Sequence, residues 1–161
     1  MTTYIGIDPG QAGGIAALGF NEHQPEAWPM PETDAEILGL LRELGPTEAE
    51  RESGTCSVFA VLEKVNAMSP GRQACFQLGG SYRALRMALT AAGIPFEEVR
   101  PEDWQRKVGV PPQKKPKLTY AKRKARLRAR AQALFPGYAV TNKTADALLM
   151  AECCRKARNG A

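Results

Sequence analysis

The sequence has little of what several common kinds of site and compartment need. It contains a single histidine, His23, and four cysteines without C-x-x-C spacing, which argues against a structural zinc site. No stretch approaches the roughly 18 apolar residues of a membrane-spanning helix, and the first residues show no signal-peptide pattern. We therefore expect a soluble, intracellular protein with no membrane partner.

Negative charge is missing from one long stretch of the chain. No Asp or Glu lies between Trp104 and Ala145, and this stretch contains twelve Lys and Arg residues. Residues 1–100 have 7 Lys and Arg against 13 Asp and Glu, a net charge of −6, whereas residues 101–161 have 15 against 4, a net charge of +11. Such a block indicates a polyanionic partner, nucleic acid first, although a solvated basic face has the same composition.

The order of predicted elements indicates an α/β protein. A length of 161 residues fits one globular domain over residues 1–161. Three strands separated by turn residues form an antiparallel meander. The predicted strands are 4–8, 14–20, 26–30, 56–63 and 94–99, and the predicted helices are 34–44 (capped by Asp34), 73–92, about 102–108, 118–134 and about 144–158. We predict a five-stranded mixed sheet with helices on both faces, with a polar stretch at about 47–54 and a basic, proline-rich loop at about 110–117.

Asp8 is a carboxylate at the end of an apolar strand, followed by a Pro9-Gly10 turn. Three interpretations fit a strand, an Asp and a glycine-rich hairpin: a metal-dependent nuclease of the RNase H type, the phosphate loop of an actin-like or sugar kinase, and an ordinary turn. The length of one domain disfavours the kinases, which duplicate such a unit into two lobes.

Two further carboxylates stand in unusual places. Glu63 ends an apolar strand, and if that strand neighbours the first one, Glu63 and Asp8 lie at the same end of the sheet, where open α/β sheets bind ligands. The alternative is a surface ion pair of Glu63 with Lys64 or Arg72. Asp146 falls on the apolar side of the last helix and needs a partner or ligand there, unless it only complements the helix dipole. Together the three acids suit Mg²⁺ and the hydrolysis of phosphodiesters.

Three segments resemble the acidic motifs of a known family. Ile5-Gly6-Ile7-Asp8-Pro9-Gly10, Leu62-Glu63-Lys64-Val65 and Ala145-Asp146-Ala147-Leu148 are similar to those of RuvC-type Holliday junction resolvases, particularly the phage and organelle-related branch. The resemblance covers nearly the whole chain. It implies an RNase H-like fold, a homodimer formed through helix 73–92, and Mg²⁺ or Mn²⁺, two ions per site. It also implies paired symmetric nicks across a four-way DNA junction, without a small-molecule cofactor. The location it implies is the cytoplasm of a bacterial or phage-infected cell, in association with the nucleoid, with an organelle as the alternative.

The chain departs from that family at one position. The family has a fourth carboxylate three or four residues before the last one, where this chain has Lys143 and Asn142. Asn142 offers a carbonyl oxygen as a metal ligand but one charge fewer, so we expect weak metal binding and a slow or inactive enzyme. Lys143 is a candidate for stabilising charge on the reacting phosphate. Three alternatives stay open: Asn142 as an N-cap, a junction-binding protein that cuts weakly or not at all, and an RNase H-like ribonuclease.

Most affinity for a DNA junction is expected to come from Lys and Arg against phosphates. Helix 118–134 is expected to lie on the sheet through Ala121, Ala125 and Ala129. The loop after Glu63 is expected at the junction centre, with Met68 as a wedge between bases. The predicted DNA-binding residues are Asn66, Met68, Arg72, Gln73, Lys114, Lys115, Lys117, Lys122, Arg123, Arg126 and Arg130.

Overall fold

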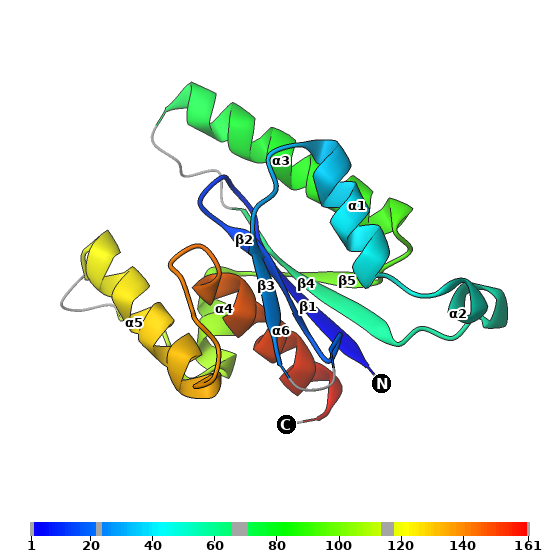
Figure 1. Ribbon diagram of the computed structural model, residues 1–161. Coiled ribbons are helices and arrows are strands. Elements are labelled where there is room, and N and C mark those ends of the chain that lie inside the picture. Colours follow the sequence, from blue (N-terminus) through cyan, green and yellow to red (C-terminus); the bar gives the residue numbers. More distant parts are fainter. Residues whose placement is uncertain (1, 22–23, 66–70, 114–117, 161) are drawn as a thin grey trace.

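Five strands form one mixed sheet in the order β3-β2-β1-β4-β5 (Figure 1). The computed structural model describes residues 2–21, 24–65, 71–113 and 118–160. The strands are β1 (Thr3–Asp8), β2 (Gly14–Leu18), β3 (Glu26–Pro29), β4 (Val58–Glu63) and β5 (Phe96–Val99). The first three pair antiparallel, whereas β1 with β4 and β4 with β5 pair parallel. The predicted meander and the mixed sheet are thus confirmed.

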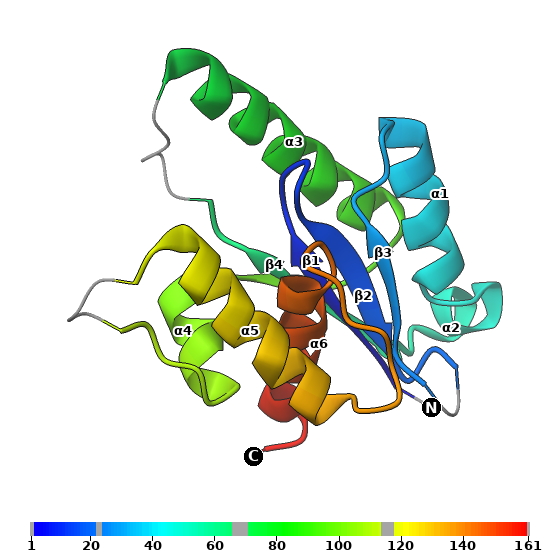
Figure 2. The ribbon, with the colours of Figure 1, turned by 60° about the vertical axis from the view of Figure 1, so that its left-hand side comes forward.

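Helices cover both faces of this sheet, as the element order predicts. Helices α1 (Asp34–Leu44) and α3 (Arg72–Ala91) lie on one face, and α4 (Pro101–Lys107), α5 (Tyr120–Leu134) and α6 (Ala145–Arg158) lie on the other (Figures 1 and 2). Alternate residues of β1 divide between two apolar cores, since Ile5 and Ile7 join the core under α1 and α3 while Tyr4 joins the core under α4 to α6. No helix in the described ranges is long and apolar enough to cross a membrane.

The structure contains a helix in the polar stretch at 47–54, for which the sequence predicts no helix or strand. Helix α2 (Glu48–Ser53) begins at a capping box, in which the Glu50 N–H donates to Thr47 Oγ1 at 3.3 Å and the Thr47 N–H donates to Glu50 Oε2 at 2.8 Å. These reciprocal bonds start a short helix without a buried face, which an apolar periodicity cannot reveal. A second capping box makes Thr33 the N-cap of α1, so the prediction of Asp34 was wrong by one residue.

Helix α6 lies directly against β1 because Gly6 has no side chain at the crossing. A Cβ built on Gly6 would lie 2.2 Å from both the Ala147 carbonyl oxygen and the Ala151 nitrogen. Every residue of α6 from Ala145 to Cys154 is buried as a result. This close approach brings the first turn of α6, with Asp146, to the end of β1, where Asp8 stands.

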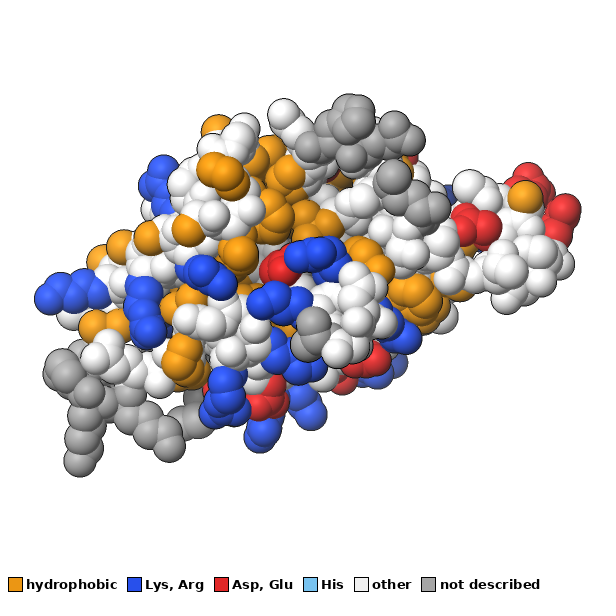
Figure 3. Space-filling view, turned by 90° about the horizontal axis from the view of Figure 1, so that it is seen from below, with side chains coloured by type: hydrophobic (Ala, Val, Ile, Leu, Met, Phe, Trp, Pro, Cys, Tyr) orange, Lys and Arg blue, Asp and Glu red, His pale blue; other side chains and the backbone are white. Residues whose placement is uncertain are grey.

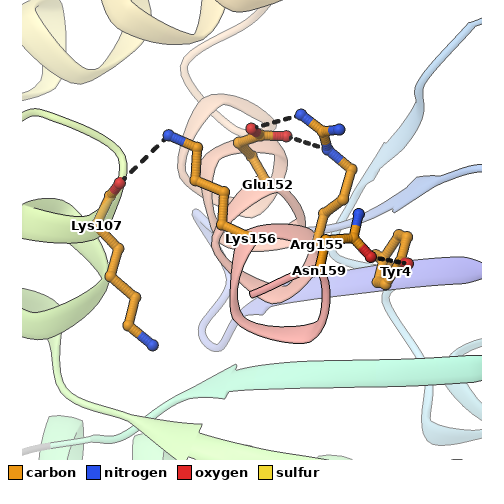
Figure 4. A network of polar contacts seen from close by, with 6 residues as sticks. All are labelled: Tyr4, Lys107, Glu152, Arg155, Lys156 and Asn159. Atoms are coloured by element: carbon orange, nitrogen blue, oxygen red, sulfur yellow. Dashed lines mark hydrogen bonds and ion pairs between the residues drawn. The ribbon is translucent and has the colours of Figure 1, made fainter. Parts of the chain in front are cut away.

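Polar contacts hold the other end of α6 in place (Figure 4). They are Tyr4 Oη to Asn159 Oδ1 at 3.0 Å, Lys156 Nζ to the Lys107 carbonyl at 3.5 Å, and a two-bond pair from Arg155 to the buried Glu152 at 2.7 and 2.8 Å. The first two reach from α6 to β1 and to the end of α4. The helix that presents Asp146 is therefore anchored at both ends.

We expect Gly6→Ala to lower the free energy of unfolding by about 3 kcal/mol or more, because the new methyl group meets backbone atoms that no rotamer change can move aside. Urea denaturation measures the change. Gly39→Ala on α1 is the control, since no atom of the described residues lies within 4 Å of a Cβ there. The same substitution should raise stability at that position by about 0.5–1 kcal/mol. A Gly6→Ala protein as stable as the unchanged chain would contradict this account of the α6 contact.

Candidate functional site

Three carboxylates meet at the end of the sheet where β1 and β4 stop. Asp8 and Glu63 are the last residues of β1 and β4, which are parallel neighbours with Ile7 opposite Leu62. The condition on which the meeting of Asp8 and Glu63 depends, that these two strands are neighbours, is therefore met. Asp146 reaches the same end of the sheet from the first turn of α6 and is only 6% exposed. We call Asp8, Glu63 and Asp146 the carboxylate cluster.

Burial and mutual repulsion shift the protonation of this cluster. Burial first, and then the charge of Asp146, raise the pKa of Asp8 to about 6 against the opposing charge of Lys124. Burial and the charges of Asp8 and Asp146 raise the pKa of Glu63 to about 8. The indole N–H of Trp104 lies near Glu63 and opposes this rise in pKa. Among the described residues, however, this N–H has no partner at hydrogen-bond geometry. The cluster therefore favours a proton or a cation.

Lys124 of α5 supplies one such cation from within the chain. Its Nζ lies 2.5 Å from Asp146 Oδ2 and 3.8 Å from Asp8 Oδ2, and its side chain is 17% exposed. Burial alone would lower the pKa of Lys124, but the charge and hydrogen bond of Asp146 and the charge of Asp8 outweigh burial and raise it. Lys124 is thus a charged member of the site.

The role of Lys124 was not predicted from the sequence, because the wrong face of α5 was expected to pack on the sheet. Ala121, Ala125 and Ala129 are exposed, whereas the buried residues of α5 are Leu127 and Ala131. Lys124 lies three residues before Leu127 and seven before Ala131, on the same helical stripe. Extending that stripe toward the start of the helix would have found a lysine on its inner face.

The donor atoms of the cluster fit a divalent cation, but the observed arrangement is not a preformed metal site. All the donors are carboxylate oxygens, which suit Mg²⁺ and Mn²⁺. Asp146 Oδ1 is buried and has no hydrogen-bond partner among the described residues, so it is an acceptor that a cation would satisfy. No three His, Cys, Asp or Glu side chains in the described part of the chain are arranged to hold a metal ion. Lys124 stands beside two of the three acids instead.

Asn142 and Lys143 line a groove of about 700 Å³ that shares Lys124 with this site. The exposed Ala121, Ala125 and Ala129 also line it. We call it the alanine groove. Asn142 does not cap α6, because the N-cap is Thr144, whose Oγ1 accepts the Thr141 N–H at 3.1 Å. The N-cap interpretation of Asn142 is therefore wrong, and the side chain is exposed at the groove.

The predicted DNA-binding residues divide into three groups. Arg72 and Gln73 in the first turn of α3, and Lys122 and Arg123 on α5, are exposed. Arg126 and Arg130 donate to the carbonyls of Pro111 and Val108, at 3.1 and 2.8 Å, and so tie α5 to the segment after α4. Asn66, Met68, Lys114, Lys115 and Lys117 lie outside the described residues.

Basic side chains gather on the face of the sheet that α4, α5 and α6 cover. Seen from that side, Lys and Arg spread across the surface, and a group of Asp and Glu lies at the end that carries α2 (Figure 3). The helices α4, α5 and α6 together hold 11 Lys and Arg against 4 Asp and Glu, a net charge of +7 on one face of the sheet. A surface of this kind attracts phosphate groups, and the attraction weakens with salt.

The raised pKa values predict how stability depends on pH. Because the folded protein holds protons on Asp8 and Glu63 that the unfolded chain has already lost, the free energy of unfolding should fall as pH rises from about 5 to 8. Without divalent cations, we expect a decrease on the order of 2 kcal/mol. Urea denaturation in chelator at several pH values measures it. Glu63→Gln should flatten the upper part of the curve, whereas Glu43→Gln, at an exposed site on α1, should leave it unchanged. A curve that rises toward pH 8 would contradict the assignment.

Comparisons with known proteins identify the fold. No protein-family model matches the chain, and no curated protein matches it. Among solved structures, T. thermophilus RuvC in complex with Holliday junction substrate aligns with 99% of this chain and 97% of its own, at 16% identity and a TM-score of 0.61. The Thermus thermophilus RuvC structure aligns over the same shares at 16% identity and a TM-score of 0.57. At this identity the similarity establishes the fold alone, and the chain has the RNase H-like α/β fold of RuvC.

Proposed function

We propose that this chain is a metal-dependent endonuclease that cuts four-way DNA junctions, of the phage and organelle-related branch of resolvases. The main support is the convergence of Asp8, Glu63 and Asp146 at the ends of two parallel strands in an RNase H-like fold. The basic face beside these acids supplies a surface for phosphates. One protein with this fold, T. thermophilus RuvC, is known bound to a Holliday junction substrate.

The carboxylate cluster would hold the metal ions, with Asn142 offering a neutral oxygen from the border of the alanine groove. Mg²⁺ or Mn²⁺, when bound, would activate a water molecule and offset negative charge at the scissile phosphate. Asp8 and Glu63 keep fixed positions because each ends a paired strand, and Asp146 is fixed by the contact of α6 with β1. Lys143, exposed at the groove, would neutralise charge that develops on the phosphate.

The DNA would cross the face formed by α5 and the start of α6. Lys122 and Arg123 are exposed there and would contact phosphates. Arg126 and Arg130 have remaining N–H groups for phosphates, but their bonds to backbone carbonyls also fix the segment after α4. We expect Arg72 and Gln73, at the start of α3, to lie nearer the junction centre.

We infer that two copies associate through α3. The beginning of this helix extends past the edge of the sheet (Figures 1 and 2), and its Phe76 side chain is 84% exposed. Met87, 67% exposed, lines a hollow of about 570 Å³ between α3 and β5. Large exposed apolar side chains on one helix are typical of a protein interface. A pair of active sites would provide the two symmetric cuts, and sedimentation should give the mass of a dimer.

A second candidate is a protein of the same fold that binds junctions without cutting them efficiently. Two observations favour it: the neutral Asn142 on the groove that Lys124 also lines, and the Lys124 ammonium already paired with Asp146. Both reduce the net negative charge available to a metal ion. This candidate predicts tight junction binding together with slow cleavage in Mg²⁺.

Cleavage of labelled DNA in Mg²⁺ tests the proposal. A four-way junction should receive paired nicks at symmetric positions, while a linear duplex of the same sequence should stay intact. Equal cutting of the junction and the duplex would overturn the resolvase assignment. Competition with an RNA–DNA hybrid separates the ribonuclease alternative, since a ribonuclease would prefer the hybrid to the junction.

A further inference from the structure

Lys124 belongs to two neighbouring features of the surface at once. Its ammonium contacts Asp146 and Asp8 in the carboxylate cluster, and its side chain also borders the alanine groove. The small side chains of Ala121, Ala125 and Ala129 leave the groove open beside it. A lysine has four flexible methylene groups, so its ammonium can move between neighbouring anions without a change in the backbone.

In the observed position, the Lys124 ammonium neutralises part of the carboxylate charge that a metal ion would neutralise. The buried Asp146 and the partly buried Asp8 need a nearby positive charge to stay ionised together, and Lys124 provides it. A divalent cation bound to the same carboxylates would be repelled by this ammonium at close range. In the described residues the ammonium of Lys124, and not a metal ion, is the cation that contacts Asp8 and Asp146.

The alanine groove offers Lys124 another anion. Lys143 and Arg128 also line the groove, so a DNA phosphate entering it would meet three cations. A phosphate there competes with Asp146 for the Lys124 ammonium. Movement of the ammonium toward the phosphate would leave Asp8 and Asp146 without this counter-ion. Asp146 Oδ1, which has no hydrogen-bond partner among the described residues, would then be open to a metal ion.

We propose that Lys124 is a resident counter-ion that disfavours binding of the divalent metal in the DNA-free protein and leaves the carboxylate cluster when a DNA phosphate occupies the alanine groove. Lys124 is then a positioning residue for Asp8 and Asp146. The proposal rests on the proposed function, because it concerns the metal site of the nuclease. DNA and metal should bind cooperatively, and each should raise the affinity for the other by the same factor.

Mn²⁺ binding to the DNA-free protein, followed by electron paramagnetic resonance of the free ion, tests this inference. Lys124→Met should bind Mn²⁺ about tenfold more tightly than the unchanged chain. Lys122→Met removes the same charge from the exposed side of α5 and should change the affinity less than about twofold. Lys124→Arg, which keeps the charge, should stay close to the unchanged chain. Equal affinities for Lys124→Met and the unchanged chain would overturn the inference while leaving the proposed nuclease intact. Absence of Mn²⁺ binding in every variant would overturn both.

Two further measurements separate this role from a purely structural one. A four-way junction with phosphorothioate linkages at its centre should raise the Mn²⁺ affinity of the unchanged chain about tenfold and that of Lys124→Met by clearly less. Should Lys124→Met unfold in chelator, titration with Mn²⁺ should refold it, because the ion replaces the missing charge. A variant that stays unfolded at all Mn²⁺ concentrations would refute the inference.

Discussion

Asp8→Asn is expected to slow junction cleavage by about a thousandfold or more. The change keeps the size of the side chain but removes the charge at the end of β1, and metal-assisted catalysis depends on several kcal/mol of charge stabilisation that such a ligand set provides. Asp8 is a cleaner choice than Asp146, because the 2.5 Å contact of Lys124 with Asp146 is left in place. Single-turnover cleavage of a labelled junction in Mg²⁺ measures the effect.

Binding and stability distinguish a lost ligand from a lost fold. The affinity of Asp8→Asn for the junction should be unchanged or higher, because a negative charge near the phosphates has gone. Thermal unfolding should show no loss, since burial raises the pKa of Asp8 and makes its charged form costly. Asp103→Asn is the matched control, at a half-buried aspartate of α4 that pairs with Arg100 at 3.0 Å. Cleavage by Asp8→Asn at the rate of the control would remove Asp8 from the metal site.

Much of the fold could be predicted because its signals are local. The run that ends at Asp8 is apolar and the glycines at 13 and 14 allow a tight return, so β1 and β2 follow from neighbouring residues alone. The adjacency of β1 and β4 joins segments that are far apart in the sequence. Before the structure was known, it was only the condition under which Asp8 and Glu63 would meet. Helix α2 escaped prediction because its capping box, and not a buried face, defines it.

The same contrast between local signals and long-range contacts applies to the carboxylate cluster. Each acid could be located because it breaks an apolar pattern within its own element. Lys124 could not be assigned to the cluster in that way, since its contacts with Asp8 and Asp146 span long stretches of sequence. Its helix also contains many other cations, and the alanines of the opposite stripe looked equally suited to burial. Packing of Leu127 and Ala131 decided which stripe faces inward.

Asn142→Asp is expected to increase cleavage in Mg²⁺ by about tenfold or more. Asn142 borders the groove next to the cluster and does not serve as the N-cap of α6, so its replacement leaves the start of that helix intact. The substitution supplies a fourth carboxylate, and hard divalent cations gain affinity with each added ligand charge. The new charge also offers Lys124 another partner at the groove, which would weaken its hold on Asp146.

The metal dependence of cleavage tells whether the missing charge limits this protein. For Asn142→Asp, half-maximal cleavage should need less Mg²⁺ than for the unchanged chain, and junction binding in chelator should weaken slightly because a negative charge now borders the groove. Asn159→Asp makes the same chemical change at the far end of α6, where the new side chain can still accept the hydrogen bond from Tyr4, and it should alter neither quantity. If Asn142→Asp and the unchanged chain both bind the junction but neither cuts it, the chain is a junction-binding protein, because a charge at position 142 is then not what separates it from a nuclease.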